Sequence, residues 1–314
     1  SAQLSAADGV LPDTDLRGEL IRLEAACSSL INAEEVREQL VELSGTIFYS
    51  ADVARRSQIF SMPASLDGSA SLVVDNGAQP ALSPDGRRLT YVGTDQNSLG
   101  LWVVALDAPP SARGTPLTDF IEDGQESPAT WSSSGDRIAF SSRRESDRQI
   151  RIYTSWSDGR DNRTIAFGTD PAWRPGQDWI VHNGTDRTGN RPGLWLRRSD
   201  GTDPERLTTI ERDLQPTWTP DGRWIVFTSD GRDANRELYR LDINEGTVVR
   251  VTSDPAQDVS PSVSPDGRHV AFFSDRGGEW GIWVIELDGG EPTRLAPLQG
   301  TLMDWRKHAL QWVQ

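Results

Sequence analysis

The chain of 314 residues is poor in the residues that build most metal and redox centres. It has one cysteine, Cys27, so it forms no internal disulfide and holds no cysteine-rich metal site. Its three histidines, His182, His269 and His308, are widely spaced, which leaves little for a histidine-based metal or relay centre. The sequence also lacks a P-loop, a His-Glu-x-x-His motif, an EF-hand loop and a Gly-x-Ser-x-Gly elbow. No catalytic residue and no protein-held metal is therefore predicted.

Lysine and long apolar runs are scarce as well. Lys307 is the only lysine among 32 basic residues, against 47 acidic ones, and the net charge is −15. A field of this sign repels phosphate backbones and argues against nucleic-acid binding. The longest apolar stretches are strand-sized, far short of the roughly 18–20 residues of a membrane helix. We therefore expect no membrane insertion by this segment.

What the sequence does contain is a repeat. Residues 79–87, 215–223 and 260–268 share the pattern Pro-x-x-(Ser/Thr)-Pro-Asp-Gly-Arg, and weaker copies occupy 127–137 and 170–177. The copies recur about every 45 residues, the period of repeats that build propellers or solenoids. Five prolines mark the start of the copies: Pro80, Pro128, Pro171, Pro216 and Pro261.

Each copy predicts one four-stranded antiparallel blade. After the Asp-Gly turn come a β-rich run, an aliphatic–aromatic pair such as Leu238-Tyr239, a second turn and a last short strand. Residues 45–78 predict three further strands but lack the proline motif that starts each copy. Trp305, near the other end, stands in a weak copy of that motif. Joined, these make a sixth blade from both ends of the chain, although Ile47–Tyr49 and Ala309–Val313 compete for one place in it. The fold class is all-β: a six-bladed β-propeller of four-stranded antiparallel blades, closed by both chain termini.

The first 44 residues are expected to form a short helical extension or linker before a propeller at 45–314. Their apolar residues follow helical spacing and form one stripe: Leu16, Leu20, Leu23, Cys27 and Leu30. The stripe packs on the propeller flank, or it is a dimerisation seam or stalk; both alternatives stay open. The chain begins with Ser and carries no signal segment, so we expect a processed form or a piece of a longer protein, with attachment to a missing N-terminal domain.

The repeat resembles that of TolB-like propellers, also called the WD40-like or PD40 repeat, over residues 45 to about 306. The resemblance implies a six-bladed bacterial propeller, periplasmic or extracellular, that binds a protein or peptide. Other members of the family accompany a hydrolase domain or carry ligands in the central channel. The repeat motif is structural, so it assigns no functional residue here.

Charged residues fall at particular positions of the repeat. Loops between blades should lie near the axis and carry carboxylates, so we expect an acidic channel mouth, formed by Glu126, Asp170, Asp213 and Asp258. Loops joining the second and third strands should form a rim on the same face, formed by Arg143, Arg144, Arg187, Arg232 and Arg276. Two interpretations stay open: the acids only cap turns, or the mouth binds a basic peptide or Ca²⁺ while the rim steers an acidic partner. No other cofactor is expected.

Two functions remain open. The first is a non-catalytic protein- or peptide-binding or sensing module, the extracytoplasmic part of a larger bacterial protein. The alternative is the propeller of a hydrolase or lyase, with its site in the central channel or its catalytic domain missing from this chain. His182 aligns with Phe140, Phe227 and Phe272 in a buried strand, and we expect it to be a core histidine with satisfied hydrogen bonds.

Overall fold

The turns that begin each repeat explain much of the local structure. The computed structural model describes residues 43–66, 68–95, 99–118, 127–143, 145, 147 and 149–314. In the first copy the Asp85 carboxylate accepts hydrogen bonds from the Ser83 hydroxyl (2.5 Å) and the Arg87 backbone N–H (3.1 Å). Gly86 takes a φ of 68°, which favours glycine. Because this turn reverses the chain within a few residues, it sets the antiparallel pairing of the strands on either side.

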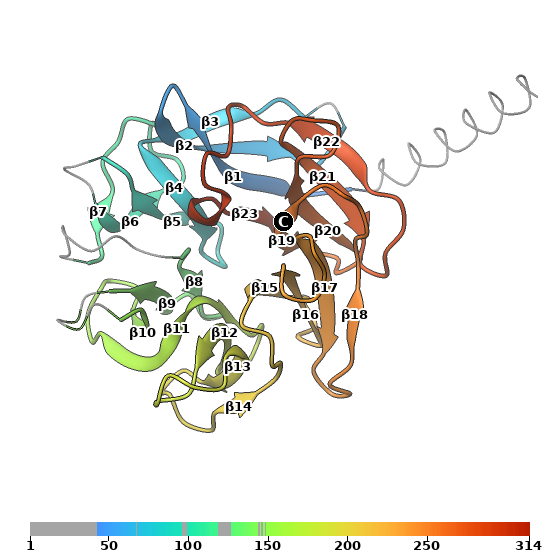
Figure 1. The fold of residues 1–314 in the computed structure, drawn as a ribbon. Coiled ribbons are helices and arrows are strands. Elements are labelled where there is room, and N and C mark those ends of the chain that lie inside the picture. Colours follow the sequence, from blue (N-terminus) through green and yellow to red (C-terminus); the bar gives the residue numbers. More distant parts are fainter. Residues whose placement is uncertain are drawn as a thin grey trace, which may run out of the picture. The chain divides into compact units, whose positions relative to one another are not determined.

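Five antiparallel sheets result, and Figure 1 shows them arranged around a central axis within the compact unit Ser44–Gln314. The first contains β23 (Leu310–Val313), β1 (Thr46–Val53), β2 (Arg56–Pro63) and β3 (Ser71–Asp75). The second contains β4 (Gly77–Leu82), β5 (Arg88–Gly93), β6 (Gly100–Ala105) and β7 (Thr115–Pro116).

A third sheet has seven strands: β8 (Thr130–Trp131), β9 (Arg137–Ser142), β10 (Arg151–Trp156), β11 (Arg163–Trp173), β12 (Trp179–Thr185), β13 (Gly193–Arg198) and β14 (Glu205–Arg206). The fourth contains β15 (Asp213–Trp218), β16 (Trp224–Ser229), β17 (Glu237–Asp242) and β18 (Val248–Arg250). The fifth contains β19 (Asp258–Val263), β20 (His269–Ser274), β21 (Gly281–Glu286) and β22 (Thr293–Pro297). A single 3₁₀ turn, η1, covers Trp305–Lys307.

The expected all-β propeller of antiparallel sheets is confirmed, but six separate four-stranded blades are not found. Four sheets have four strands and one has seven. The reason is β11, which runs without interruption: its first half pairs with β10 and its second half with β12. The predicted helical extension at 1–44, with Cys27, lies almost entirely outside the described residues. Within the part of the chain that is described, no helix is long and apolar enough to cross a membrane.

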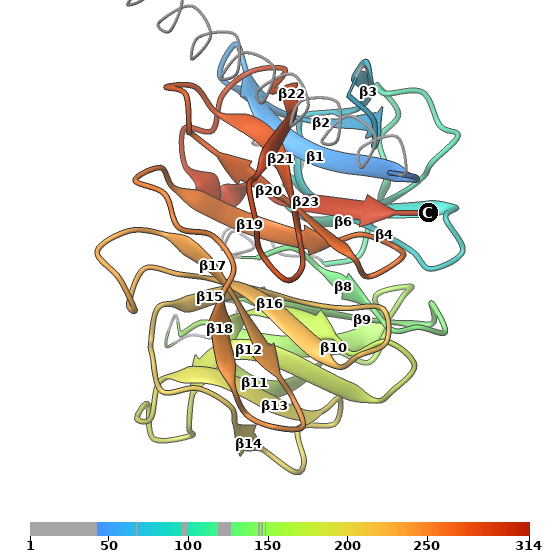
Figure 2. The same ribbon diagram turned by 90° about the vertical axis from the view of Figure 1, so that its right-hand side faces the viewer.

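Both ends of the described unit meet in one sheet. β23 is the innermost strand and pairs antiparallel with β1, with Trp312 opposite Ile47 (Figures 1 and 2). Both competing segments are therefore used, side by side. The expectation that Trp305 anchors this blade is wrong: it lies in η1, outside the sheets, and Trp312 takes the equivalent position. The helix-like turn follows from the local hydrogen bonds of Asp304, which caps it.

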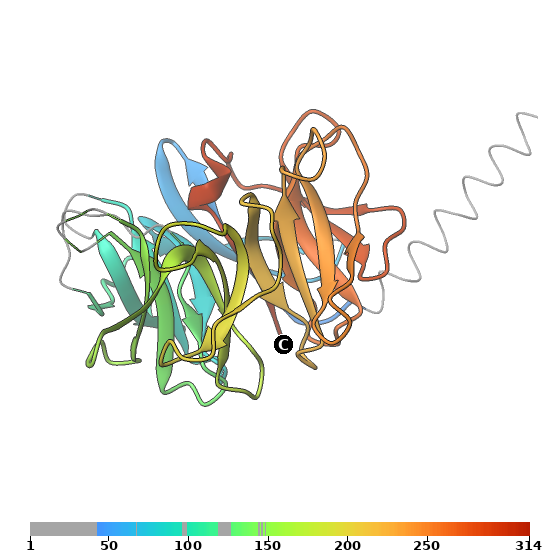
Figure 3. The same cartoon turned by 60° about the horizontal axis from the view of Figure 1, so that its bottom comes forward.

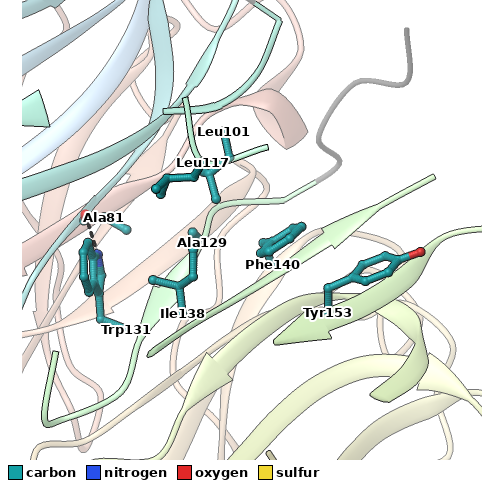
Figure 4. Close-up of a cluster of buried hydrophobic side chains, with 8 residues drawn as sticks. All are labelled: Ala81, Leu101, Leu117, Ala129, Trp131, Ile138, Phe140 and Tyr153. Atoms are coloured by element: carbon teal, nitrogen blue, oxygen red, sulfur yellow. Dashed lines mark hydrogen bonds between the residues drawn. The ribbon is translucent and has the colours of Figure 1, made fainter. Parts of the chain in front are cut away.

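Tryptophans at the inner-strand ends join neighbouring sheets. The Trp131 indole Nε1 donates to the Ala81 carbonyl of the preceding sheet (3.1 Å), a contact drawn in Figure 4. The Arg88 guanidinium lies 4.7 Å from the centre of the same ring. Trp218 repeats the arrangement with the Ala172 carbonyl (3.0 Å). Both tryptophans therefore lie between blades, and each contributes apolar burial as well as a satisfied indole N–H.

His182 is fully buried in β12, as expected of a core histidine. Its Nδ1 lies 3.0 Å from the Asn183 carbonyl, and its Nε2 accepts a hydrogen bond from Arg197 Nε (2.9 Å). Burial lowers the pKa of His182 to about 3 and that of Arg197 to about 10. His182 is therefore a neutral acceptor that satisfies a buried guanidinium.

Trp312 and Trp305 provide a matched test of the ring closure. Replacing buried Trp312 by Ala should reduce the free energy of unfolding by about 3–5 kcal/mol, whereas Trp305→Ala should cost much less, because Trp305 is half-exposed outside the sheets. Urea denaturation of both variants measures the difference. Equal losses would contradict the assignment of Trp312 to the inner-strand position.

Stability should also fall with acid through His182. The unfolded chain binds a proton on this residue below pH 6.5 while the folded chain does not, so the free energy of unfolding should drop by about 2 kcal/mol from pH 7.5 to 5. The double variant H182F/R197L places in blade β11–β14 the residue types found at the equivalent positions Phe227 and Leu241. It should fold and lose that part of the pH dependence, since all other titrating groups are shared. Identical pH profiles for the two proteins would refute the assignment.

Candidate functional site

The inner strands share an unusual backbone feature at the repeat's first proline. The residue before the proline has a positive φ in four of them: Gln79 (54°), Asp170 (53°), Gln215 (51°) and Ser260 (55°). Each of these residues lies where the register to the second strand shifts, so it forms a β-bulge with its proline. Proline is tolerated here because the innermost strand needs no ladder hydrogen bond on its channel side. Left-handed backbone outside glycine is strained, and such strain gathers at functional sites.

Hydrogen bonds between these bulges link successive sheets around the channel. Asp170 Oδ2 accepts from the Gln215 backbone N–H (3.3 Å), and Gln215 Oε1 accepts from the Ser260 backbone N–H (3.0 Å). Gln215 Nε2 also donates to the Ser260 hydroxyl (2.9 Å), which reaches the His308 carbonyl (3.5 Å). On the other side of the ring, Gln79 Nε2 donates to the Arg306 carbonyl (3.2 Å). The bulges thus connect β4, β11, β15 and β19 of the inner circle to neighbouring segments.

Inside this circle is a cavity of about 470 Å³. Its wall is formed mainly by uncharged residues, among them the five prolines Pro80, Pro128, Pro171, Pro216 and Pro261 and the tryptophans Trp131, Trp173 and Trp218. The wall runs from the bulges to the turns between first and second strands, where Gly86 and Ser133 are exposed. Asp170 is the single ionisable side chain among the described lining residues.

The predicted acidic mouth is distributed differently in the structure. Asp170 lines the cavity and also accepts from the Thr169 hydroxyl (3.1 Å). Asp213 and Asp258 are fully buried at the starts of β15 and β19, and neither lines the cavity. Glu126 lies outside the described residues.

The buried carboxylates are matched by two of the predicted rim arginines. Arg232 makes a bidentate pair with Asp213 (3.1 and 2.7 Å), and Arg276 contacts Asp258 Oδ2 (2.6 Å). Burial raises the pKa of Asp258, and the hydrogen bonds from Ser274 and Arg276 oppose that rise. In each case the acid starts one strand and the arginine follows the end of its antiparallel neighbour, so the strand register brings them together.

Two of the three remaining rim arginines lie in the described part of the chain. Arg187 is exposed in the loop between β12 and β13, and Arg143 is half-buried after β9. Arg144 lies outside the described residues. Two of the predicted rim arginines therefore form ion pairs with two of the predicted mouth carboxylates, Asp213 and Asp258.

Sequence reasoning passed over Gln79, Gln215 and Ser260, which form the bulge network with Asp170. The signal was present, since each directly precedes an anchor proline. The proline ring restricts the backbone of the residue before it, and this residue recurs at one place in each repeat, which indicates a shared structural role. Among the described residues, no three His, Cys, Asp or Glu side chains gather as a metal ion would require.

Comparisons with known proteins agree with this architecture. Residues 214–304 match the TolB beta propeller domain family. TolB from Acinetobacter baumannii superposes with a TM-score of 0.71 at 19% identity, covering 85% of this chain and 66% of that one, just under two thirds of its length. A candidate TolB from Agrobacterium tumefaciens superposes with 0.62 at 21% identity, covering 86% and 99%.

An oligogalacturonate lyase in complex with manganese is also similar, with a TM-score of 0.51 at 17% identity over 81% of this chain and 74% of that one. At these identities the likenesses establish the fold alone. No curated protein sequence matches the chain. Together, the family match over residues 214–304, the repeat and the sheets around a proline-lined channel make this chain similar to TolB-like β-propellers in sequence pattern and in fold.

Proposed function

We propose that this protein is a non-catalytic binding or sensing module that holds a protein or peptide segment in the central channel of its propeller. The observation that carries the proposal is the cavity wall, in which prolines, tryptophans and small residues surround one carboxylate, Asp170. Apolar walls with a few placed polar groups are typical of ligand sites. A cavity of about 470 Å³ accommodates a few residues of an extended segment rather than a globular partner.

A binding role fits this wall better than catalysis does. Acid–base chemistry needs titratable groups that reach the substrate, and metal catalysis needs a set of ligands. The described wall offers one such side chain. The alternative, a hydrolase or lyase, would need its chemical groups from residues beyond this wall or from a further domain. Its support is the likeness of fold to the lyase.

The ligand chemistry follows from the side chains that line the cavity. Asp213 and Asp258 already have arginine partners, so they do not attract a further cation. Asp170 faces the cavity and can receive one Lys or Arg side chain of a bound segment, while prolines and tryptophans contact its apolar neighbours. Ca²⁺ is a weaker fit, because it takes about six to eight oxygen ligands.

The finer assignments of architecture and location belong to the same proposal. We count six blades by dividing the seven-stranded sheet at β11, whose two halves serve β8–β10 and β12–β14. The TolB-like family supports a periplasmic or extracellular location in a bacterium and a larger parent protein. The boundary between the extension at 1–44 and the propeller at 45–314 remains a prediction.

The test compares Asp170→Asn with Asp107→Asn, an equal change of charge at an exposed turn residue after β6. We expect short Lys- and Arg-containing peptides to bind wild type, and Asp170→Asn to weaken the binding about tenfold, because a charge-assisted hydrogen bond is lost. Isothermal titration calorimetry with the peptides, and separately with Ca²⁺, measures both.

Asp107→Asn should bind as wild type does. Equal affinities in all three proteins, or no peptide binding by wild type, would refute the channel site. Cleavage of oligogalacturonate in the presence of Mn²⁺ would support the lyase alternative instead.

A further inference from the structure

The segment 301–308, here called the strap, leads into β23 and crosses between several sheets. Thr301 pairs with Asp52 of β1 through two backbone hydrogen bonds (2.8 and 3.1 Å). At the other end, buried His308 contacts Asp52 Oδ2 through Nε2 (3.0 Å). In between, the Arg306 carbonyl accepts from Gln79 at the start of the next sheet. The strap is therefore fixed at both ends and in the middle, and Figures 1 and 3 show η1 near the ring centre, beside the β1–β2 turn.

Outward-facing side chains of the strap are unusual for a surface segment. Met303 is 74% exposed, the highest value among the large apolar residues of the described chain. Trp305 is half-exposed and has two guanidinium groups against its ring, Arg236 at 5.2 Å and Arg306 at 5.4 Å. Arg236 comes from the loop between β16 and β17, so the contacts of the Trp305 ring join the strap to a second blade.

Cationic side chains outnumber carboxylates around Trp305. Arg212 and Arg236 share a single carboxylate, Asp230, at 3.4 Å each. Lys307, the only lysine of the chain, lies 3.8 Å from Asp304, and both are exposed. Arg306 adds a fourth cationic side chain, beside three carboxylates: Asp230, Asp304 and Asp52, which accepts from the Met303 backbone N–H (3.2 Å). This is a local surplus of positive charge on a protein whose net charge is −15.

We propose that this surface, formed by Met303, Trp305, Arg306, Lys307, Arg212 and Arg236, docks an acidic segment of a partner protein that also carries an apolar side chain. Arginine forks bind carboxylates with two parallel hydrogen bonds. Tryptophan, arginine and methionine are enriched in protein interfaces, and tryptophan and arginine dominate their binding energy. Because the remaining surface repels acids, the local surplus directs such a segment to this place.

The proposal concerns a second surface and does not depend on the channel. Asp170 lies in the cavity wall, whereas the strap side chains named here are absent from that wall. The two sites also take ligands of opposite charge. One protein can therefore bind a basic segment at the channel and an acidic one at the strap, and each can fail without the other.

The experiment uses the whole chain and a fluorescein-labelled peptide that alternates Glu with Leu, beside its Gln-for-Glu counterpart. The variant R306E/K307E reverses two exposed strap charges. The control R87E/R268E makes the same change of charge at two exposed turn residues, Arg87 and Arg268. Fluorescence anisotropy at two salt concentrations gives the affinities.

We expect the Glu peptide to bind wild type and the control, to bind R306E/K307E at least about tenfold more weakly, and to weaken as salt rises. Trp305→Ala and Met303→Ser should also weaken binding, and Asp170→Asn should not. Equal binding by R306E/K307E and its control, equal binding of the Gln peptide, or no binding by wild type would overturn the proposal. Urea denaturation of each variant confirms that it is folded.

Discussion

The architecture depends on the pairing of β23 with β1. Without β23 the inner edge of β1 would be unpaired, and exposed edges are what allow sheets to pair with other chains. The closing strand comes from the end of the sequence, whereas the strand beside it begins only a few residues into the described unit. Buried Trp312 on β23 and the His308–Asp52 contact on the strap strengthen the same joint. The channel also depends on this pairing, because β23 forms part of the cavity wall.

The same proline that marks each repeat also shapes the channel. It sits on the innermost strand, where its missing N–H removes no ladder hydrogen bond, and it forms a bulge with the residue before it. The bulge side chains then reach the next blade, as Gln215 does with Ser260. One local device therefore provides both the inter-blade contacts and the polar groups of the cavity. Because each inner strand brings its proline to the channel, the wall is rich in proline and almost free of charge.

Charged side chains are arranged in two ways. Inside the blades they form ion pairs, whereas at the strap cations outnumber carboxylates. Asp213 and Asp258 are buried with Arg232 and Arg276, so their charges are internal to the fold. Removing one partner of such a pair leaves a buried charge behind and is strongly destabilising. The strap differs, because Arg212, Arg306 and Lys307 are exposed and the cations around Trp305 outnumber the carboxylates. A partner protein would bind to these exposed groups rather than to the buried ion pairs.

The repeat alone was enough to predict an all-β propeller, its turns and most of its strands, because the Ser/Thr-Pro-Asp-Gly turn and the alternation of buried residues are local properties of the chain. Contacts between distant segments were decided by the tertiary structure. It gave Trp312 rather than Trp305 the inner-strand position, since β23 pairs with the inner edge of β1 and η1 does not. It also turned Asp213 from an expected ligand at the channel mouth into the counterion of Arg232, because antiparallel strands bring the start of one beside the end of the next. Sequence period predicts which residues recur, but only distances across strands and loops determine which of them meet.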